Sequence, residues 1–269
     1  MNRYYYPKGG LPDQSQRLYA PARFTTAYAV IPAAVMTDIV TSQLPGWERT
    51  RAWIIARPLS GFAETFAQLI VELAPGGGSS MPEPDPGAEG VVFVVHGTPT
   101  LSIGGTSHQL APGGYAFLAP GESWTIRNEG AEPACFHWIR KLWEPAPGLE
   151  RPDSFVTSDA EVTPDPMPDT EGRWATSRFV PNDDLRHDMQ VNIVTFLPGG
   201  VIPFAETHVM EHGLYVLQGQ GDYLLNTDRV TVGPGDFMWL RAFCPQACEV
   251  IGDQPFRYLL YKDINRHPR

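Results

Sequence analysis

The chain carries the same succession of short apolar segments twice, and this internal repeat limits the folds that it can adopt. Residues 66–77, FAQLIVELAPGG, resemble residues 189–200, MQVNIVTFLPGG, which lie 123 positions later. Two further pairs of segments recur 122 positions apart, namely 91–97 with 213–219 and 110–117 with 232–239. Each copy alternates apolar segments with Gly-rich or Pro-Gly turns, and no convincing amphipathic helical pattern interrupts them. Short strands at regular spacing predict an all-β chain of two tandem barrels or sandwiches.

The repeat also suggests where the domains begin and end. We expect a first barrel over residues 51–145 and a second barrel over residues 172–269. Residues 146–171 are rich in Pro, Asp and Glu, so they suggest an extended linker. Residues 1–50 form an N-terminal extension, and we expect its apolar segment 27–32 to add an edge strand to one barrel.

Composition excludes several classes of function. The formal net charge is −10 and no cluster of Lys and Arg offsets it, which argues against nucleic acid as a main partner. No stretch of about 20 apolar residues is present, so no membrane span is expected. The 26 glycines and 27 prolines fit a chain with many turns. Length bounds the organisation, because 269 residues correspond to one large or two small domains.

The cysteines indicate a reducing compartment. Cys135, Cys244 and Cys248 form no even set for disulfides, and we expect buried free thiols. Cys244 and Cys248 could pair on a zinc ion, but no second pair would complete the site. The N-terminal residues show no apolar signal region, so a cytoplasmic location is predicted.

One stretch of the second copy combines side chains that bind metal ions. Glu206 and His208 in the run ETHVMEH are two positions apart, so on a strand they point to the same face. His212 keeps the same parity and can face the same way if the strand continues. Gln246 follows His212 by 34 positions and falls on a later predicted strand. A carboxylate, two imidazoles and an amide oxygen suit a divalent ion such as Mn²⁺, Fe²⁺ or Zn²⁺. The alternative is a polar strand end with two solvated histidines.

The first copy lacks this set of ligands. The equivalent positions are occupied by Pro84, Pro86, Gly90 and Trp124. A slip of one residue in the loop would present three carboxylates that could bind a hard cation, those of Glu83, Asp85 and Glu89. The fourth position would still be Trp124, which cannot be a ligand, and the prolines stiffen the loop. We therefore expect the first barrel to be degenerate and free of metal.

Several motifs resemble a known family. The Gly-x-Gly and Pro-Gly turns resemble those of the cupin superfamily, and the duplication resembles a bicupin, which has two tandem jelly-roll barrels. A more specific resemblance, to the (S)-ureidoglycine aminohydrolase family, covers nearly the whole chain. Its motifs are 65–68, 172–176, 206–213, 219–223, 235–239 and 257–266.

This resemblance implies an activity and a cofactor. In the family, Mn²⁺ sits in the C-terminal barrel on ligands that match Glu206, His208, His212 and Gln246. The reaction releases ammonia from (S)-ureidoglycine and gives (S)-ureidoglycolate, a step of allantoin degradation in purine catabolism. Family residues that contact the substrate match Tyr223, Tyr258 and Lys262. The family also associates, and together with the apolar segment 27–32 this predicts a homo-oligomer.

The chemistry of the candidate substrate residues suggests a role for each of them. Tyr258 and Lys262 are four positions apart on the predicted last strand, so both can face inward. Lys262 offers a point charge to the substrate carboxylate, although it could be a surface lysine. Tyr223 and Tyr258 could donate hydrogen bonds to the ureido carbonyl or move protons, although aromatic packing is the alternative. Gln190 and Asn192 share a strand face and are candidates to bind the ureido group.

The sequence is also compatible with two other functions. One is a different bicupin reaction, such as that of a dioxygenase or an isomerase, and oxygen chemistry would need redox-active iron. The other is a cupin without catalytic activity that binds a small acid.

Overall fold

The computed structural model describes residue 15 and residues 22–36, 41–58 and 61–264. Within these residues the chain is built from short strands, with 3-10 turns such as η1 (Ala33–Val35) and no α-helix. The all-β architecture predicted from the repeat is confirmed. No helix in the described part of the chain has the length and hydropathy needed to cross a membrane.

The first barrel is built from one large sheet of antiparallel strands. Its strand order is β11-β8-β5-β10-β4-β9-β6-β7, and β3 pairs with β4 outside this path. The strands are β3 (Trp47–Ala56), β4 (Ala67–Ser79), β5 (Ala88–His96), β6 (Thr100–Ile103), β7 (Thr106–Gln109), β8 (Gly114–Leu118), β9 (Trp124–Arg127), β10 (Ala134–Leu142) and β11 (Phe155–Ser158).

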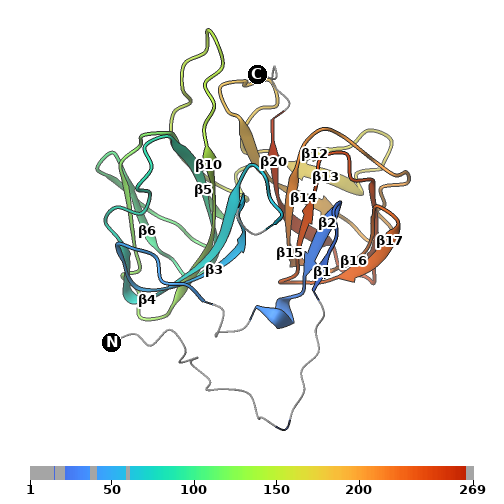
Figure 1. Ribbon diagram of the computed structural model, residues 1–269, viewed down its shortest axis with the longest axis horizontal. Coiled ribbons are helices and arrows are strands. Elements are labelled where there is room, and N and C mark those ends of the chain that lie inside the picture. Colours follow the sequence, from blue (N-terminus) through green and yellow to red (C-terminus); the bar gives the residue numbers. More distant parts are fainter. Residues whose placement is uncertain (1–14, 16–21, 37–40, 59–60, 265–269) are drawn as a thin grey trace.

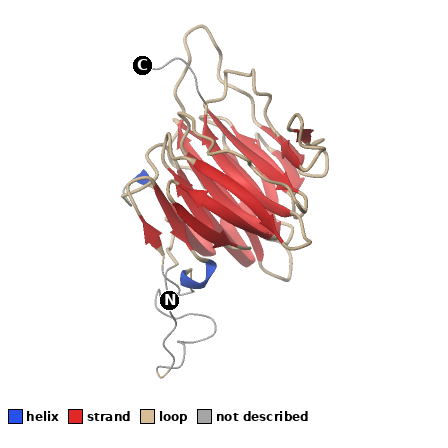
Figure 2. Cartoon of the chain, turned by 90° about the vertical axis from the view of Figure 1, so that its right-hand side faces the viewer, coloured by secondary structure: helices blue, strands red, loops and turns tan. Residues whose placement is uncertain are grey.

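The second barrel is built from a large sheet and a small one. The large sheet has the order β1-β2-β18-β15-β20-β14-β13-β12, and the small sheet has the order β17-β16-β19. The strands are β1 (Arg23–Phe24), β2 (Tyr28–Ile31), β12 (Asp165–Pro166), β13 (Trp174–Ser177), β14 (Met189–Phe196), β15 (His212–Gln218), β16 (Gln220–Leu225), β17 (Asp228–Val232), β18 (Phe237–Leu240), β19 (Gln246–Ile251) and β20 (Phe256–Asp263). The two barrels lie side by side in Figure 1, and Figure 2 shows their strands in stacked layers with loops at both ends.

The central strands of both large sheets are buried on both faces, and this explains their almost continuous apolar sequence. Successive side chains on a strand point to opposite faces. On β20, Tyr258 and Leu260 belong to the core inside the second barrel, whereas Leu259 and Tyr261 belong to the core between the barrels. On β8, the same alternation assigns Ala116 and Leu118 to the core inside the first barrel and Tyr115 and Phe117 to the core between the barrels.

Segments outside the two repeats complete the sheets. The edge strand expected from residues 27–32 is present, because β2 pairs with β18 of the second barrel. Residues 146–171, which the sequence suggests as an extended linker, contribute β11 to the first sheet and β12 to the second sheet. The ring of Phe155 stacks on Tyr115 and on Phe117, so apolar packing draws this segment onto the first barrel.

The joint between the barrels requires a glycine at position 213. Gly213 follows His212 on β15, and a Cβ added there would lie 2.6 Å from Cζ of Phe66. The Phe66 ring cannot move away freely, because it is 1% exposed and stacks on Tyr261 with a centroid distance of 3.9 Å.

We predict that Gly213→Ala lowers the free energy of unfolding by about 1–3 kcal/mol, the usual cost of overpacking a core. Urea denaturation followed by tryptophan fluorescence measures the change. Gly233→Ala is the matched control, because the nearest atom to an added Cβ at that position is 3.7 Å away and φ is not in the left-handed region. Equal stability of the two variants would contradict the assigned contact between β15 and Phe66.

Candidate metal centre in the second barrel

The four predicted ligands meet at one end of the second barrel. His212 is the first residue of β15, Gln246 is the first residue of β19, and Glu206 lies in the preceding loop. Glu206 and Gln246 form an isolated antiparallel bridge, in which each backbone N–H donates to the other carbonyl at 2.8 and 2.9 Å. This bridge places a loop residue and a strand residue side by side, although 40 positions separate them.

The expectation that Glu206, His208 and His212 share one strand is wrong. Residues 207–211 form a loop between the bridge and β15. The carbonyl of His208 accepts the N–H of Phe243 at 2.7 Å, and the N–H of Glu211 donates to Oδ1 of Asp263 at 2.6 Å. These contacts replace the ladder hydrogen bonds that a continuous strand would make.

The side chains of the four residues nevertheless converge. His208 Nε2 lies 3.8 Å from Oε1 of Glu206, and the two imidazole rings have a centroid distance of 4.4 Å. Nε2 of Gln246 lies 3.4 Å from Nε2 of His208 and 3.4 Å from Nδ1 of His212. His212 and Gln246 are buried, whereas the Glu206 and His208 side chains are 29% and 23% exposed. The cluster therefore opens to solvent on the side of Glu206 and His208.

Burial controls the charge of this cluster. It raises the pKa of Glu206, and the neighbouring His208 and Lys262 partly oppose this. It lowers the pKa of His212 well below the usual value, with His208 and Lys262 adding to the shift. A neutral imidazole is the form that binds a metal ion.

Two observations indicate that the donor set fits a divalent cation. Nδ1 of His208 and Nε2 of His212, which are not the ring nitrogens closest to Gln246, are buried and have no hydrogen-bond partner among the described residues, which is uncommon for buried polar atoms. The set also contains one carboxylate, two imidazoles and one amide, which suits Mn²⁺. In the described part of the chain, no three His, Cys, Asp or Glu side chains are arranged as a preformed metal site. The amide of Gln246 lies between the imidazoles with its nitrogen toward them, so it would have to turn to present its oxygen.

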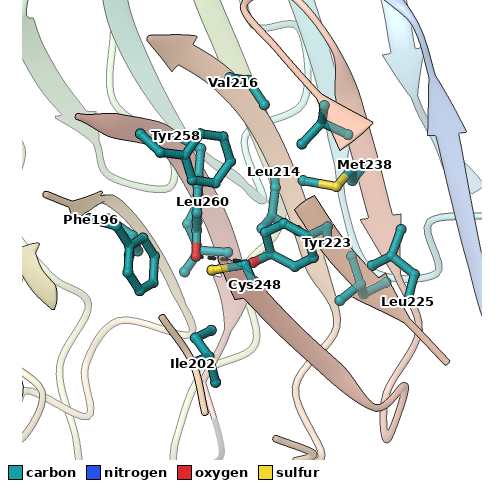
Figure 3. Close-up of a cluster of buried hydrophobic side chains, with 14 of the residues drawn as sticks. Phe196, Ile202, Leu214, Val216, Tyr223, Leu225, Met238, Cys248, Tyr258 and Leu260 are labelled. Carbon is teal, nitrogen blue, oxygen red and sulfur yellow. Dashed lines mark hydrogen bonds between the residues drawn. The ribbon is translucent and has the colours of Figure 1, made fainter. Parts of the chain in front are cut away.

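The two candidate tyrosines, Tyr223 and Tyr258, lie next to each other in the hydrophobic core of the second barrel (Figure 3), and Tyr223 reaches Gln246 of the cluster. The hydroxyl of Tyr223, on β16, lies 3.2 Å from the hydroxyl of Tyr258 and 3.5 Å from Oε1 of Gln246. Both tyrosines are buried within the barrel, and burial raises the pKa of each hydroxyl well above 10.0. Both hydroxyls are therefore protonated at neutral pH and can donate hydrogen bonds.

Lys262 faces the same interior. On β20 it is paired with His212 of β15 on one side and with Gln190 of β14 on the other. Residues directly opposite each other on antiparallel strands project from the same face of the sheet. Burial lowers the pKa of Lys262, and Arg178 adds to this shift by repulsion. The alternative of an exposed surface lysine is wrong, because the Lys262 side chain is partly buried beside the cluster.

Gln190 and Asn192 extend the polar part of the barrel interior. Each is 2% exposed, and Nδ2 of Asn192 lies 3.3 Å from Oε1 of Gln190. Oδ1 of Asn192 is buried without a hydrogen-bond partner among the described residues. This oxygen is available to accept a hydrogen bond from a bound molecule.

Sequence reasoning missed two residues at this site. Arg178 follows β13 and is one of the charges that lower the pKa of Lys262, while its Nη1 contacts Oδ2 of Asp165 at 3.0 Å. Its even spacing from Trp174 and Thr176 on β13 was a usable signal, because both of those residues face the barrel interior. The second missed residue is Glu211, between the two histidines, and its contacts depend on the first barrel.

The corresponding place in the first barrel is built differently. Arg140 pairs with Gly90 there, as Lys262 pairs with His212 in the second barrel. Nε and Nη2 of Arg140 contact the two carboxylate oxygens of Glu83 at 2.5 and 2.6 Å. The adjoining cavity of about 220 Å³ is also lined by Trp124. This ion pair engages one of the three carboxylates that a slipped loop register would need for a cation.

Comparisons with known proteins agree with this geometry. The Cupin domain family matches residues 69–140 and 192–261. The (S)-ureidoglycine aminohydrolase of Escherichia coli (strain K12) is 30% identical over 229 residues, which cover 85% of this chain and 86% of that protein. The (S)-ureidoglycine aminohydrolase of Arabidopsis thaliana is 30% identical over 230 residues, which cover 85% of this chain and 74% of that protein.

A solved structure agrees over the full chain. It is a crystal structure of a Pseudomonas aeruginosa protein described as glyoxylate induced, with 60% sequence identity and a TM-score of 0.90. The match covers 100% of this chain and 98% of that one. The resemblance predicted from the motifs is thus confirmed, and the chain belongs to the (S)-ureidoglycine aminohydrolase family of enzymes within the cupin superfamily.

Proposed function

We propose that this protein hydrolyses (S)-ureidoglycine to ammonia and (S)-ureidoglycolate, using Mn²⁺ held by Glu206, His208, His212 and Gln246. The observation that carries the proposal is the convergence of these four side chains in a chain that belongs to this family. When bound, the ion would polarise substrate heteroatoms and stabilise charge that develops at the reacting carbon.

The chain's own residues can bind and orient such a substrate. Lys262 faces the same interior as His212, and a substrate carboxylate beside it would favour its charged form, which burial alone disfavours. Arg178 would add to the positive potential beside Lys262. The two cations therefore support binding of a small molecule that carries a carboxylate.

The ureido group would meet neutral polar side chains. The hydroxyls of Tyr223 and Tyr258 supply donors for its carbonyl oxygen, and Oδ1 of Asn192 supplies an acceptor for its N–H groups. Gln190 holds the Asn192 amide in place through the contact between their side chains. Because all four residues are buried, water is largely excluded from the side of the substrate that they contact.

We further propose that the protein acts in the cytoplasm, in purine catabolism through allantoin, and that it works as a homo-oligomer. The first barrel would carry no metal. The paired Arg140 and Glu83 support this view, because a carboxylate bound at both oxygens by a guanidinium is a poor ligand for a cation.

The activity can be tested directly. Ureidoglycine generated in the assay by enzymatic degradation of allantoin should give ammonia and (S)-ureidoglycolate faster when this protein and MnCl₂ are added than in their absence. Formation of ammonia at the uncatalysed rate, in the presence of metal-loaded protein, would exclude the proposed reaction.

We predict one Mn²⁺ per chain, and its loss in His208→Ala and His212→Ala, because each substitution removes one imidazole ligand. Elemental analysis of the purified variants after dialysis measures the manganese content per chain. Glu83→Ala is the control and should retain the metal. Full retention in both histidine variants would show that the ion is bound elsewhere, and loss in Glu83→Ala would place it in the first barrel.

We predict that Lys262→Met lowers kcat/KM for ureidoglycine on the order of tenfold to a hundredfold, mostly through KM. A charge-assisted contact is worth roughly 1.5–3 kcal/mol, and a carboxylate carries its charge in both the ground state and the transition state. Steady-state kinetics measures the effect. Arg229→Met, which removes a cation whose side chain is 64% exposed, should leave both constants unchanged. A collapse of kcat with constant KM would instead assign Lys262 to the chemical step.

A further inference from the structure

A buried carboxylate joins the two barrels at the loop that carries the histidines. Glu211 lies between His208 and His212 and is 5% exposed. Its Oε1 accepts the backbone N–H of Glu64 at 2.6 Å and the indole N–H of Trp239 at 2.5 Å. Its Oε2 accepts the backbone N–H and the hydroxyl of Thr65, at 2.9 and 2.5 Å. A carboxylate has about four acceptor sites, so Glu211 is fully satisfied.

The donors come from both barrels. Glu64 and Thr65 lie shortly before β4 of the first barrel, which begins at Ala67, whereas Trp239 belongs to β18 of the second barrel. Neighbouring residues project to opposite sides of an extended chain. His212 therefore points into the second barrel while Glu211 points into the joint. The first barrel thus holds the backbone of the histidine loop (residues 207–211) on the side that faces away from the interior of the second barrel.

Other contacts fix the same short segment. The Glu211 N–H donates to Asp263, the residue after Lys262. The hydroxyl of Tyr261 lies 2.9 Å from that of Thr65, which already donates its proton to Glu211, so Tyr261 is the donor in this pair. The loop is therefore tied to the end of β20 as well as to the first barrel.

We propose that Glu211 is a positioning residue for the metal centre, and that the first barrel sets the positions of His208 and His212 through the two backbone amides and the Thr65 hydroxyl that bind this carboxylate. The inference rests on the proposed metal-dependent function. It assigns to the first barrel a task that needs no metal of its own. Partners that orient metal ligands change metal affinity by about tenfold to a hundredfold when they are removed.

The test uses the full chain, freed of metal with EDTA, and Mn²⁺ alone as the probe. Titration with MnCl₂, followed by the electron paramagnetic resonance signal of free Mn²⁺, gives Kd without any substrate. In Glu211→Gln the side chain keeps its shape but loses its charge, and one oxygen acceptor becomes an N–H₂ donor that faces existing donors. We expect Kd to rise tenfold to a hundredfold relative to the wild type.

Two further variants separate positioning from stability. Thr65→Val removes one donor from the first barrel without touching the histidine loop, so it should raise Kd by a smaller factor, roughly threefold to tenfold, below the range for losing a whole partner. Asp159→Asn removes the charge from another contact between the barrels, the ion pair with Arg257 at 2.6 Å, at the opposite end of β20. It should lower Tm but leave Kd unchanged.

Each outcome decides a different point. Wild-type protein that binds no Mn²⁺ would overturn the proposed function and this inference together. Wild-type binding with an unchanged Kd in Glu211→Gln would overturn the inference alone. If Glu211→Gln does not fold, Thr65→Val decides, and an unchanged Kd in that variant overturns the inference. Equal increases in Kd for Thr65→Val and Asp159→Asn would also overturn it, because they would show a general effect of a loosened joint.

Discussion

The structure depends on strands that are buried on both faces. β20 contributes Tyr258 and Leu260 to the inside of the second barrel, and Leu259 and Tyr261 to the core between the barrels. The strict alternation of side chains means that the register of β20 is set by two apolar environments at once. This register also makes the Lys262 side chain point into the second barrel. A slip by one residue would turn the Lys262 side chain into the apolar core between the barrels, where an unpaired charge is strongly destabilising.

Duplication explains why the two barrels share a scaffold but differ at equivalent positions. The pairing of Lys262 with His212 corresponds to the pairing of Arg140 with Gly90. In the first barrel a guanidinium binds Glu83, a carboxylate of the same chain. In the second barrel the corresponding ammonium has no comparable bidentate partner among the described contacts. The same backbone thus supports a self-contained ion pair in one copy and a partly buried cation beside the ligand cluster in the other.

The sequence predicts most of the fold and part of the candidate site, for reasons that are physical. Strands and turns follow from local periodicity and glycine placement, and residues on regular strands, such as Tyr258 and Lys262, follow from parity. The path of residues 207–211 cannot be predicted in this way, because it is set by contacts with Phe243 and Asp263, which are distant in sequence. For residues 146–171 the sequence predicts only a linker. Their short strands are formed by pairing with distant strands, and no local pattern marks them. No local signal marks Glu211, because its donors Glu64, Thr65 and Trp239 lie 147, 146 and 28 positions away in the sequence.

The joint between the barrels also explains how a buried charge can be placed so close to the histidines. An ionised carboxylate removed from water is destabilising unless its acceptor sites are filled. Glu211 receives two backbone amides, a hydroxyl and an indole N–H, and backbone amides cannot be lost by substitution of a side chain. Three of these donors, the two backbone amides and the Thr65 hydroxyl, exist only because the first barrel presents the segment before β4 at this point. Removing the first barrel would therefore leave Glu211 buried with unfilled acceptor sites or exposed to water, and in either case the loop that carries His208 would lose its fixed position. A barrel for which we propose no metal can in this way be required for the metal centre that we propose in its neighbour.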